Sequence, residues 1–383
     1  MFLTQWLRTL RWGGRAVALG VLLLASAASA ADGPQGVTEP IVLAPFDASA
    51  ADCSAPPGLT KTLAFVQDNQ RKFIEGAGYG LAAAAKDRGL DYKDLVANND
   101  AQLQARQVQG LVADKTGAIV TPPVDPASLA PALRGAIWSG AFVGTVVPPP
   151  AITIVNAPQY LTGRVLGEAA AAYIRARFGG KADVVLLTQD TLQFLAPRFA
   201  AIRDALKDMP EVDIVADISP NPVNEQGGYE TMKLILEAHP NVDVVLGADT
   251  VVLGALKALR EAGKARADQF LGGIDGEPDA VAEIKMGNSP YKVSVALSSA
   301  VFGYALGAAA ADWLGGKSVP QAIDALPIAL DSTDIAQYEA DQADPGAVFA
   351  DPQRRDLYIK RYGNICYDSR DRYLAFPWSS ETK

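Results

Sequence analysis

The sequence predicts an α/β protein built from two lobes, each a doubly wound parallel sheet with helices on both faces. Short apolar runs alternate with longer amphipathic stretches from residue 61 to 155, and the alternation repeats from 156 to 297. Strands and helices in alternation build a parallel sheet covered on both faces. The chain has 383 residues, which exceeds one typical domain and fits two such blocks.

The first block opens on an unbroken apolar run at Leu63–Val66, typical of a buried strand. The Ala-rich stretch that follows reads as a helix ended by Gly89, and proline runs after residues 121 and 147 stop two later strands. The predicted strands cover residues 63–66, 95–96, 118–120 and 142–147. The predicted helices cover residues 75–88, 101–114 and 128–138.

The second block has the same texture and ends in an apolar helix. Its predicted strands cover residues 183–187, 212–218, 242–246, 270–274 and 293–297. Its predicted helices cover residues 162–178, 197–207, 228–237, 251–261 and 300–314. We expect residues 61–155 plus 298–326 to form the N-terminal lobe and residues 156–297 to form the C-terminal lobe.

Both ends of the chain differ from this pattern. Residues 31–60 are rich in Pro, Gly and Ser and predict an extended arm, whereas residues 327–383 are polar and aromatic without a regular period and predict a tail packed on the body. The two cysteines, Cys53 and Cys366, lie in these two segments. In an exported protein such a pair predicts a disulfide, the alternative being two unpaired thiols.

The first 30 residues have the order of a secretory signal peptide. Three arginines precede the apolar run Ala16–Ala25, and small residues follow, so we expect cleavage after Ala30. The alternative is an N-terminal membrane anchor, but the apolar run is short for a span. Because the first Cys lies well beyond the cleavage point, a lipid anchor is not expected, and the protein is expected to be free in the periplasm.

Composition and residue types exclude several function classes. Removal of three arginines changes the net charge of −9 to about −12, which disfavours binding to nucleic acid or to an anionic membrane. His239 is the sole histidine and precedes Pro240 in a turn, so a Ser-His-Asp triad is not expected. The sequence also has no metal-binding or phosphate-binding motif. We therefore expect a monomer that is not an enzyme and has neither cofactor nor metal.

Candidate binding residues follow the predicted strands, because ligands of parallel sheets bind beyond the carboxyl ends of the strands. Two such edges that face each other form a cleft, where ligand sites are common. The candidates chosen on this ground are Asp68, Asn69, Gln70, Arg71, Thr121, Asn224, Asp249, Asp275 and Ser298.

Three segments resemble a known family. Residues 238–249, residues 253–264 and the turn Gly272–Pro278 are similar in residues and spacing to the type I periplasmic binding proteins of the ribose and galactose class. The resemblance implies two lobes joined by three crossings, which close over a small solute and present it to an ABC permease in the inner membrane. A sensor that presents its ligand to a membrane receptor is an alternative with the same fold.

The resemblance also implies roles for three particular residues. Phe73 lies where the family has an aromatic segment that stacks on the ligand, Arg198 where it has an Arg of the second lobe, and Asp275 where it has its ligand-binding Asp. Structural interpretations stand beside these: Asp275 and Asp249 as helix caps, Arg198 as an ion-pair partner and Phe73 as plain core.

Three positions depart from the family pattern. Where the family has polar side chains, this sequence has Val147-Pro148, Ala248 and Leu297. A buried sugar hydroxyl without a partner costs about 1–3 kcal/mol. The resemblance favours a sugar or a sugar-like ligand, but these departures argue against a simple pentose or hexose held in the usual way. Either polar partners come from elsewhere, such as Gln193, Asn221 or the tail, or the ligand is a less hydroxylated or apolar solute.

Overall fold

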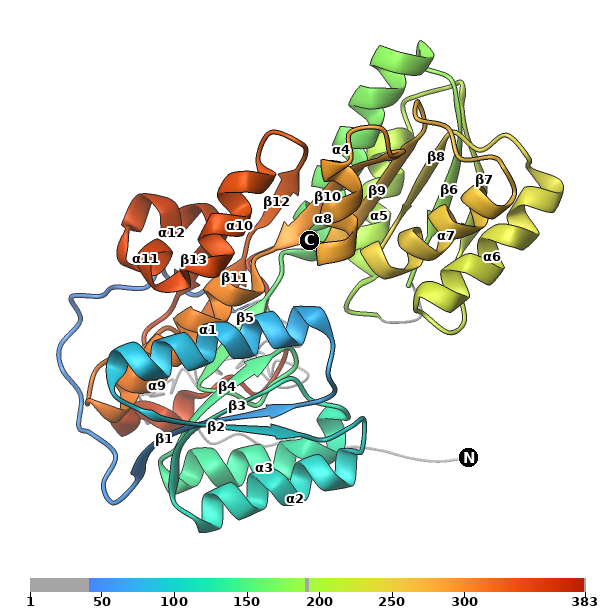
Figure 1. Cartoon of the computed structure of the whole chain (residues 1–383). Coiled ribbons are helices and arrows are strands. Elements are labelled where there is room, and N and C mark those ends of the chain that lie inside the picture. Colours follow the sequence, from blue (N-terminus) through green and yellow to red (C-terminus); the bar gives the residue numbers. More distant parts are fainter. Residues whose placement is uncertain (1–40, 190–192, 382–383) are drawn as a thin grey trace, which may run out of the picture.

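The computed structural model describes residues 41–189 and 193–381, and its chain forms two lobes, each around its own sheet (Figure 1). The N-lobe sheet has the strand order β13-β11-β5-β4-β3-β1-β2, and the C-lobe sheet has the order β12-β10-β9-β8-β6-β7. All neighbouring strands are parallel except the pairs β10–β12 and β11–β13. The predicted fold class, two parallel-sheet lobes with helices on both faces, is confirmed. The predicted signal peptide lies outside the described residues.

The strands have the following bounds. The N-lobe sheet contains β1 (Thr60–Gln67), β2 (Asp91–Val96), β3 (Thr116–Thr121), β4 (Phe142–Val146), β5 (Thr153–Asn156), β11 (Ala322–Ala325) and β13 (Ile359–Tyr362). The C-lobe sheet contains β6 (Ala182–Leu187), β7 (Val212–Ile218), β8 (Val244–Gly247), β9 (Phe270–Asp275), β10 (Tyr291–Leu297) and β12 (Pro327–Leu330). Every strand that the sequence predicted is present within a few residues.

The helices pack in pairs. The N-lobe has α1 (Lys72–Arg88) against α9 (Ser299–Leu314) and α2 (Ala101–Ala113) against α3 (Pro126–Ser139). The C-lobe has α4 (Gln159–Phe178) against α5 (Ala196–Leu206) and α6 (Glu225–Ala238) against α7 (Asp249–Glu261), with α8 (Pro278–Lys285) beside β10. The tail adds α10 (Ile335–Ala343), α11 (Pro345–Ala350), α12 (Pro352–Tyr358) and the 3-10 helix η1 (Tyr367–Arg372).

Helices α1 and α9 approach each other closely because glycines face the neighbouring backbone. A Cβ at Gly80 would lie 2.0 Å from the carbonyl oxygen of Ala300, and a Cβ at Gly303 would lie 2.2 Å from that of Ala77. Neither position accepts a side chain at this separation. This contact fixes α1, which begins directly after the polar residues 68–71, against α9, which follows the crossing from the C-lobe.

The chain crosses between the lobes three times, as the resemblance implied. The first crossing joins β5 to α4, the second joins β10 to α9 at Ser298, and the third joins β11 to β12 at Leu326. The sequence missed β5, β11 and β12, since each is only four residues long and gives no periodic signal.

The tail has more regular structure than the sequence predicted. Strand β12 lies within the range assigned to the tail, yet it pairs with β10 in the C-lobe sheet. Helices α11 and α12 each begin at an Asp-Pro pair, and the side chains of Asp344 and Asp351 accept hydrogen bonds from the backbone of the first turn. Asp at the N-cap followed by Pro is a helix-start signal that local pattern reading can detect even in so short a helix.

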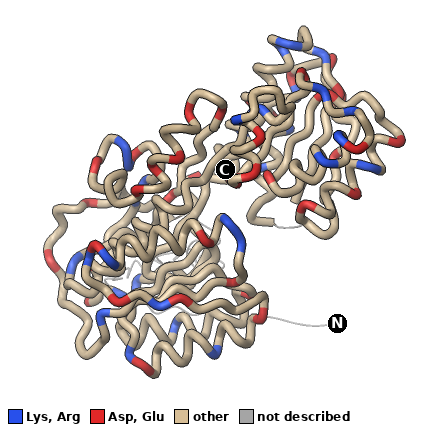
Figure 2. Tube along the Cα trace, in the orientation of Figure 1, with Lys and Arg blue, Asp and Glu red and all other residues tan. Residues whose placement is uncertain are grey.

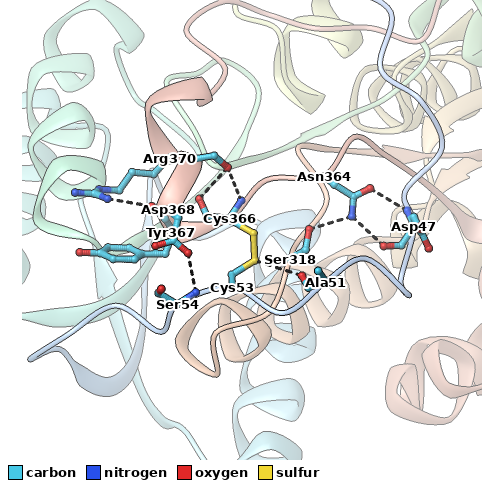
Figure 3. The surroundings of a disulfide bond; sticks show 11 residues. Asp47, Ala51, Cys53, Ser54, Ser318, Asn364, Cys366, Tyr367, Asp368 and Arg370 are labelled. Carbon is cyan, nitrogen blue, oxygen red and sulfur yellow. Dashed lines mark hydrogen bonds between the residues drawn. A yellow bond between two sulfur atoms is a disulfide. The ribbon is translucent and has the colours of Figure 1, made fainter.

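The predicted disulfide between Cys53 and Cys366 is present and joins the N-terminal arm to the tail (Figure 3). The two Cα atoms are 5.7 Å apart, a usual spacing for this bond. Hydrogen bonds flank it on both sides: the backbone N–H of Ser54 donates to Asp368 at 2.7 Å, and that of Asp47 donates to Asn364 at 3.0 Å. The arm is therefore fixed to the tail over more than the disulfide itself.

Candidate functional site

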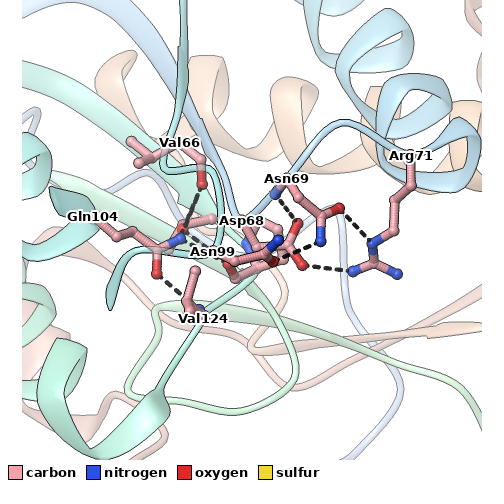
Figure 4. Close-up of polar contacts among 9 residues, drawn as sticks. Val66, Asp68, Asn69, Arg71, Asn99, Gln104 and Val124 are labelled. Atoms are coloured by element: carbon pink, nitrogen blue, oxygen red, sulfur yellow. Dashed lines mark hydrogen bonds and ion pairs between the residues drawn. The ribbon is translucent and has the colours of Figure 1, made fainter. Parts of the chain in front are cut away.

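The N-lobe edge of the predicted cleft is a network of polar side chains that follows β1 (Figure 4). Arg71 donates to Asp68 at 2.8 Å and to Asn69 at 3.1 Å, and Asn69 donates to Asn99 at 2.8 Å. Asp68 is largely buried whereas Gln70 and Arg71 are exposed. Hydrogen bonds thus bring together three of the predicted residues, Asp68, Asn69 and Arg71, with Asn99 from the turn after β2 as a member that the sequence did not indicate.

Phe73 lies in the first turn of α1, next to this network. Its ring is half-buried and packs at 5.7 Å, centroid to centroid, against Phe302 of α9. The side chain therefore has both a packing contact and a partly accessible surface. An aromatic ring in this arrangement suits the apolar face of a cyclic solute.

The C-lobe edge is centred on Arg198 and Asp275. The Arg198 guanidinium lies 3.7 Å from the Asp275 carboxylate and donates to Gln159 at 2.9 Å. Arg198 is buried, but 30% of the Asp275 side chain remains exposed. Asp275 has a φ of 121°, a conformation that residues other than Gly rarely adopt. Helix α8 has no side-chain cap, so Asp275 does not have the capping role that was the alternative.

Burial and neighbouring charges shift the pKa values of this edge. Burial raises the pKa of Asp275, against the opposing effect of the Arg198 and Arg71 charges, and burial lowers the pKa of Arg198. Burial, together with the charges of Asp275 and Asp249, raises the pKa of Glu277 to about 7. Near neutral pH the Glu277 carboxyl group is therefore present in both its protonated and its ionised form, and the sequence had suggested this residue only as a helix start.

Asp249 lies beneath this edge as a structural group. It is fully buried and accepts hydrogen bonds from the hydroxyls of Tyr291 at 2.6 Å and Ser294 at 2.7 Å, and from the backbone of Glu277 at 2.8 Å. Burial raises its pKa to about 6. A Cβ at Gly273 would lie 1.8 Å from its carboxylate, so this arrangement requires Gly there. Asp249 lies in the first turn of α7 without capping it, contrary to the alternative interpretation.

Three further candidates have their polar groups occupied within the fold. The hydroxyl of Thr121 is buried and donates to the carbonyl of Val66 at 2.7 Å. Ser298 is buried and accepts from Gln342, and Asn224 caps α6 by accepting from the backbone of Gly227 at 2.9 Å. Asn224 also borders a shallow hollow of about 370 Å³ between α6 and α7. Within the described residues, no hydrogen bond joins any of these three side chains to Asp275.

The two edges carry opposite charges where they face each other. Arg71 acts on the pKa values of Asp275 and Glu277, and the charges of Asp279 and Glu277 help to raise the pKa of Lys72, after the larger effect of Glu75. Figure 2 shows basic residues at the end of α1 that is nearer to the C-lobe. No hydrogen bond or ion pair joins Arg71 or Lys72 to the C-lobe within the described residues. The edges are close enough to attract each other without being in contact.

The three departures from the family pattern are apolar in the structure as well. Ala248 and Leu297 are buried, and Val147 packs half-buried in a cluster with Leu374 and Trp378 of the tail. At position 147 the tail thus covers a side chain that the family pattern makes polar.

Two classes of site find no support in the part of the chain that the structure describes. Among residues 41–189 and 193–381, no three His, Cys, Asp or Glu side chains are grouped to hold a metal ion. In the same ranges no helix combines the length and the apolar character that a membrane span needs.

Comparison with known proteins gives a consistent result. Residues 63–318 match the sequence pattern of the periplasmic binding protein domain family. The ribose import binding protein of Bacillus subtilis is 28% identical over 264 residues, covering 66% of this chain and 81% of its own length. The xylitol-binding protein of Mycolicibacterium smegmatis is 28% identical over 289 residues, covering 72% and 79%.

Solved structures share the fold. A Mycobacterium smegmatis protein in complex with β-D-fucofuranose has a TM-score of 0.64 at 21% identity, covering 79% of this chain and 99% of that one. A solute-binding protein of Actinobacillus succinogenes with bound D-allose has a TM-score of 0.63 at 20% identity, covering 72% and 99%.

Proposed function

The chain belongs to the periplasmic binding protein domain family, and from this premise we propose that it binds a sugar or polyol between its lobes and delivers it to an ABC permease of the inner membrane. The proposal places the mature protein in the periplasm as a monomer, after removal of residues 1–30. The chain is not an enzyme, because the family consists of solute binders.

One observation carries the proposal: the two lobes each present an edge of hydrogen-bonding side chains, and the two edges face each other. The N-lobe edge offers Asn69, Gln70 and Arg71, and the C-lobe edge offers Arg198 and Asp275. Carboxylates and guanidinium groups each form several hydrogen bonds, as a ring of hydroxyls requires. Relatives named for ribose and xylitol, and a neighbour with bound D-allose, support a hydroxylated solute.

A second candidate ligand is a less hydroxylated solute, and the buried apolar side chains of Ala248 and Leu297 favour it. An apolar wall leaves a sugar hydroxyl without a partner at about 1–3 kcal/mol each. A deoxy sugar, or a sugar with an apolar substituent, would have fewer hydroxyls to leave unpaired.

A thermal-shift screen of the mature protein tests the proposal. Ribose, xylitol and D-allose are compared with deoxy sugars, aromatic acids and lipophilic solutes at matched concentrations. A ligand at a hundredfold excess over its Kd stabilises the folded state by about 2.7 kcal/mol, which raises Tm by several degrees. Stabilisation confined to aromatic acids and lipophilic solutes would contradict the proposal, and stabilisation confined to deoxy sugars would favour the second candidate.

A further inference from the structure

The tail helix α10 contacts both lobes at the hinge, although it lies beyond the residues 63–318 that match the family. Its Glu339 forms an ion pair with Lys285 of α8 in the C-lobe, at 2.9 and 3.0 Å to the two carboxylate oxygens. At its end the carbonyl of Ala343 accepts from the hydroxyl of Tyr79, on α1 of the N-lobe, at 2.7 Å. Figure 1 shows α10 beside α8, near the crossing from β10 to α9.

The same helix reaches the second crossing itself. Gln342 donates to the hydroxyl of Ser298, which directly follows Leu297. Leu297 is one of the positions at which the family pattern has a polar side chain. Helix α10 is therefore anchored next to Leu297, an apolar residue at a position where the family pattern has a hydrogen-bonding side chain.

Tyr338 projects from α10 toward the C-lobe edge of the cleft. A Cβ at Gly276 would lie 3.0 Å from the Tyr338 hydroxyl oxygen, so this hydroxyl contacts the backbone of the residue that follows Asp275. Burial, with smaller effects of the Asp249 and Glu277 charges, raises the pKa of Tyr338. The hydroxyl thus stays protonated and lies within electrostatic range of these carboxyl groups.

The Tyr338 hydroxyl forms no hydrogen bond within residues 41–189 and 193–381, and its oxygen is not among the fully buried polar atoms that lack a partner, although the residue as a whole is only 8% exposed. Other buried tyrosines have partners: Tyr291 donates to Asp249 and Tyr358 donates to Asp341. The Tyr338 hydroxyl is therefore an accessible donor that no protein group occupies, and a solute beside Gly276 can accept from it.

We propose that the Tyr338 hydroxyl donates a hydrogen bond to the solute, so that the tail forms a third wall of the cleft and replaces polar groups lost at positions 248 and 297. This inference rests on the proposed function, since it names a residue that binds the same ligand. The donor comes from a segment outside the matched family region, which explains how a cleft with fewer polar side chains still holds a hydroxylated molecule.

The test is Tyr338→Phe, which removes the hydroxyl and keeps the ring. Affinities for ribose, xylitol and D-allose are measured by calorimetry, together with the Tm of the ligand-free protein. We expect binding of the solute that the wild type prefers to weaken by about five- to tenfold, the usual loss for one hydrogen bond to a neutral group. The ligand-free Tm should not fall, because the hydroxyl pairs with no protein group.

Tyr173→Phe is the matched control. The hydroxyl of Tyr173 donates to the carbonyl of Asp268 at 3.0 Å, and Asp268 precedes β9 at the end of the C-lobe sheet opposite Asp275. This variant should keep the wild-type affinity. Equal affinities of Tyr338→Phe and the wild type would overturn the inference while leaving the proposed function intact. A wild type that binds only aromatic acids or lipophilic solutes in the thermal-shift screen would overturn both.

Discussion

At the scale of single residues, the C-lobe edge concentrates carboxyl groups around one buried cation. Asp275 pairs with Arg198, Glu277 lies close to Asp275, and Asp249 accepts a hydrogen bond from the backbone of Glu277. The resemblance indicated Asp275 and Arg198 from sequence alone. It did not indicate Glu277 or Gln159, because their roles depend on burial and on contacts between separate elements, which no local pattern encodes.

Asp275→Asn tests the central carboxylate. Because a carboxylate accepts hydrogen bonds with both oxygens and carries the charge that faces Arg198, we expect solute affinity to fall by about 1–3 kcal/mol. Asp213→Asn, an exposed carboxylate at the start of β7 and so at the end of the sheet away from Asp275, is the control and should bind normally. Unchanged affinity for Asp275→Asn in calorimetry would leave Asp275 with a structural role only.

Glu277 predicts a pH dependence of stability. Its pKa rises from an ordinary 4.5 to about 7 on folding, so the folded state holds the proton more tightly than the unfolded chain. The stabilisation is fully present below pH 4.5 and is lost as the pH rises through about 7. Glu277→Gln should therefore be more stable than the wild type at pH 8, by on the order of 1 kcal/mol, and match it at low pH.

Urea unfolding at pH 5 and pH 8 measures this effect. Asp249, whose pKa is raised to about 6, makes the unfolding free energy fall with rising pH in both proteins. The effect of Glu277 is therefore the difference in unfolding free energy between wild type and variant. A difference that stays constant across this range would show that Glu277 does not titrate as its surroundings indicate.

At the scale of elements, the sequence predicted the regular strands and helices well and the short ones badly. The long helices and the apolar strands can be predicted from the periodicity of their apolar residues and from stop signals such as Gly89. Strands β5, β11, β12 and β13 have only four residues each and exist because they pair with neighbours far along the chain. The position of α10 against the cleft depends on contacts with both lobes, and its sequence has no feature that reports them.

Helix α4, the first of the C-lobe, receives its cap from the end of the chain. Its N-cap residue, Pro158, forms no side-chain cap, and the Glu381 carboxylate accepts from the backbone of Tyr160 at 3.0 Å and Leu161 at 2.7 Å. We expect Glu381→Ala to lower the free energy of unfolding by about 1 kcal/mol, the usual value of a cap together with its charge.

Urea denaturation measures this loss, with Glu381→Gln as the control. The Gln side chain keeps an acceptor oxygen but lacks the charge, so its stability should lie between the two. An Ala variant as stable as the wild type would mean that water satisfies these backbone groups equally well.

At the scale of the whole molecule, the disulfide closes the chain into one loop between residues 53 and 366. A bond that spans so long a loop removes much of the conformational freedom of the unfolded chain. Replacing both cysteines by Ser should lower the stability of the folded protein by about 2–5 kcal/mol, seen as a lower Tm. Counting thiols under denaturing, non-reducing conditions should find none in the wild type, and two reactive thiols would contradict the bond.

Closure of the lobes is the last expected consequence of this architecture. A solute held by both edges stabilises the closed form by its difference in affinity for the two forms. Closure also brings Arg71 and Lys72 nearer to Glu277 and Asp279, so their attraction favours the closed form and weakens with salt. Small-angle scattering should show a smaller radius of gyration with saturating ligand, and Lys72→Glu should raise the ligand concentration at which this change occurs. Identical dimensions with and without ligand would exclude closure as the way this protein captures its solute.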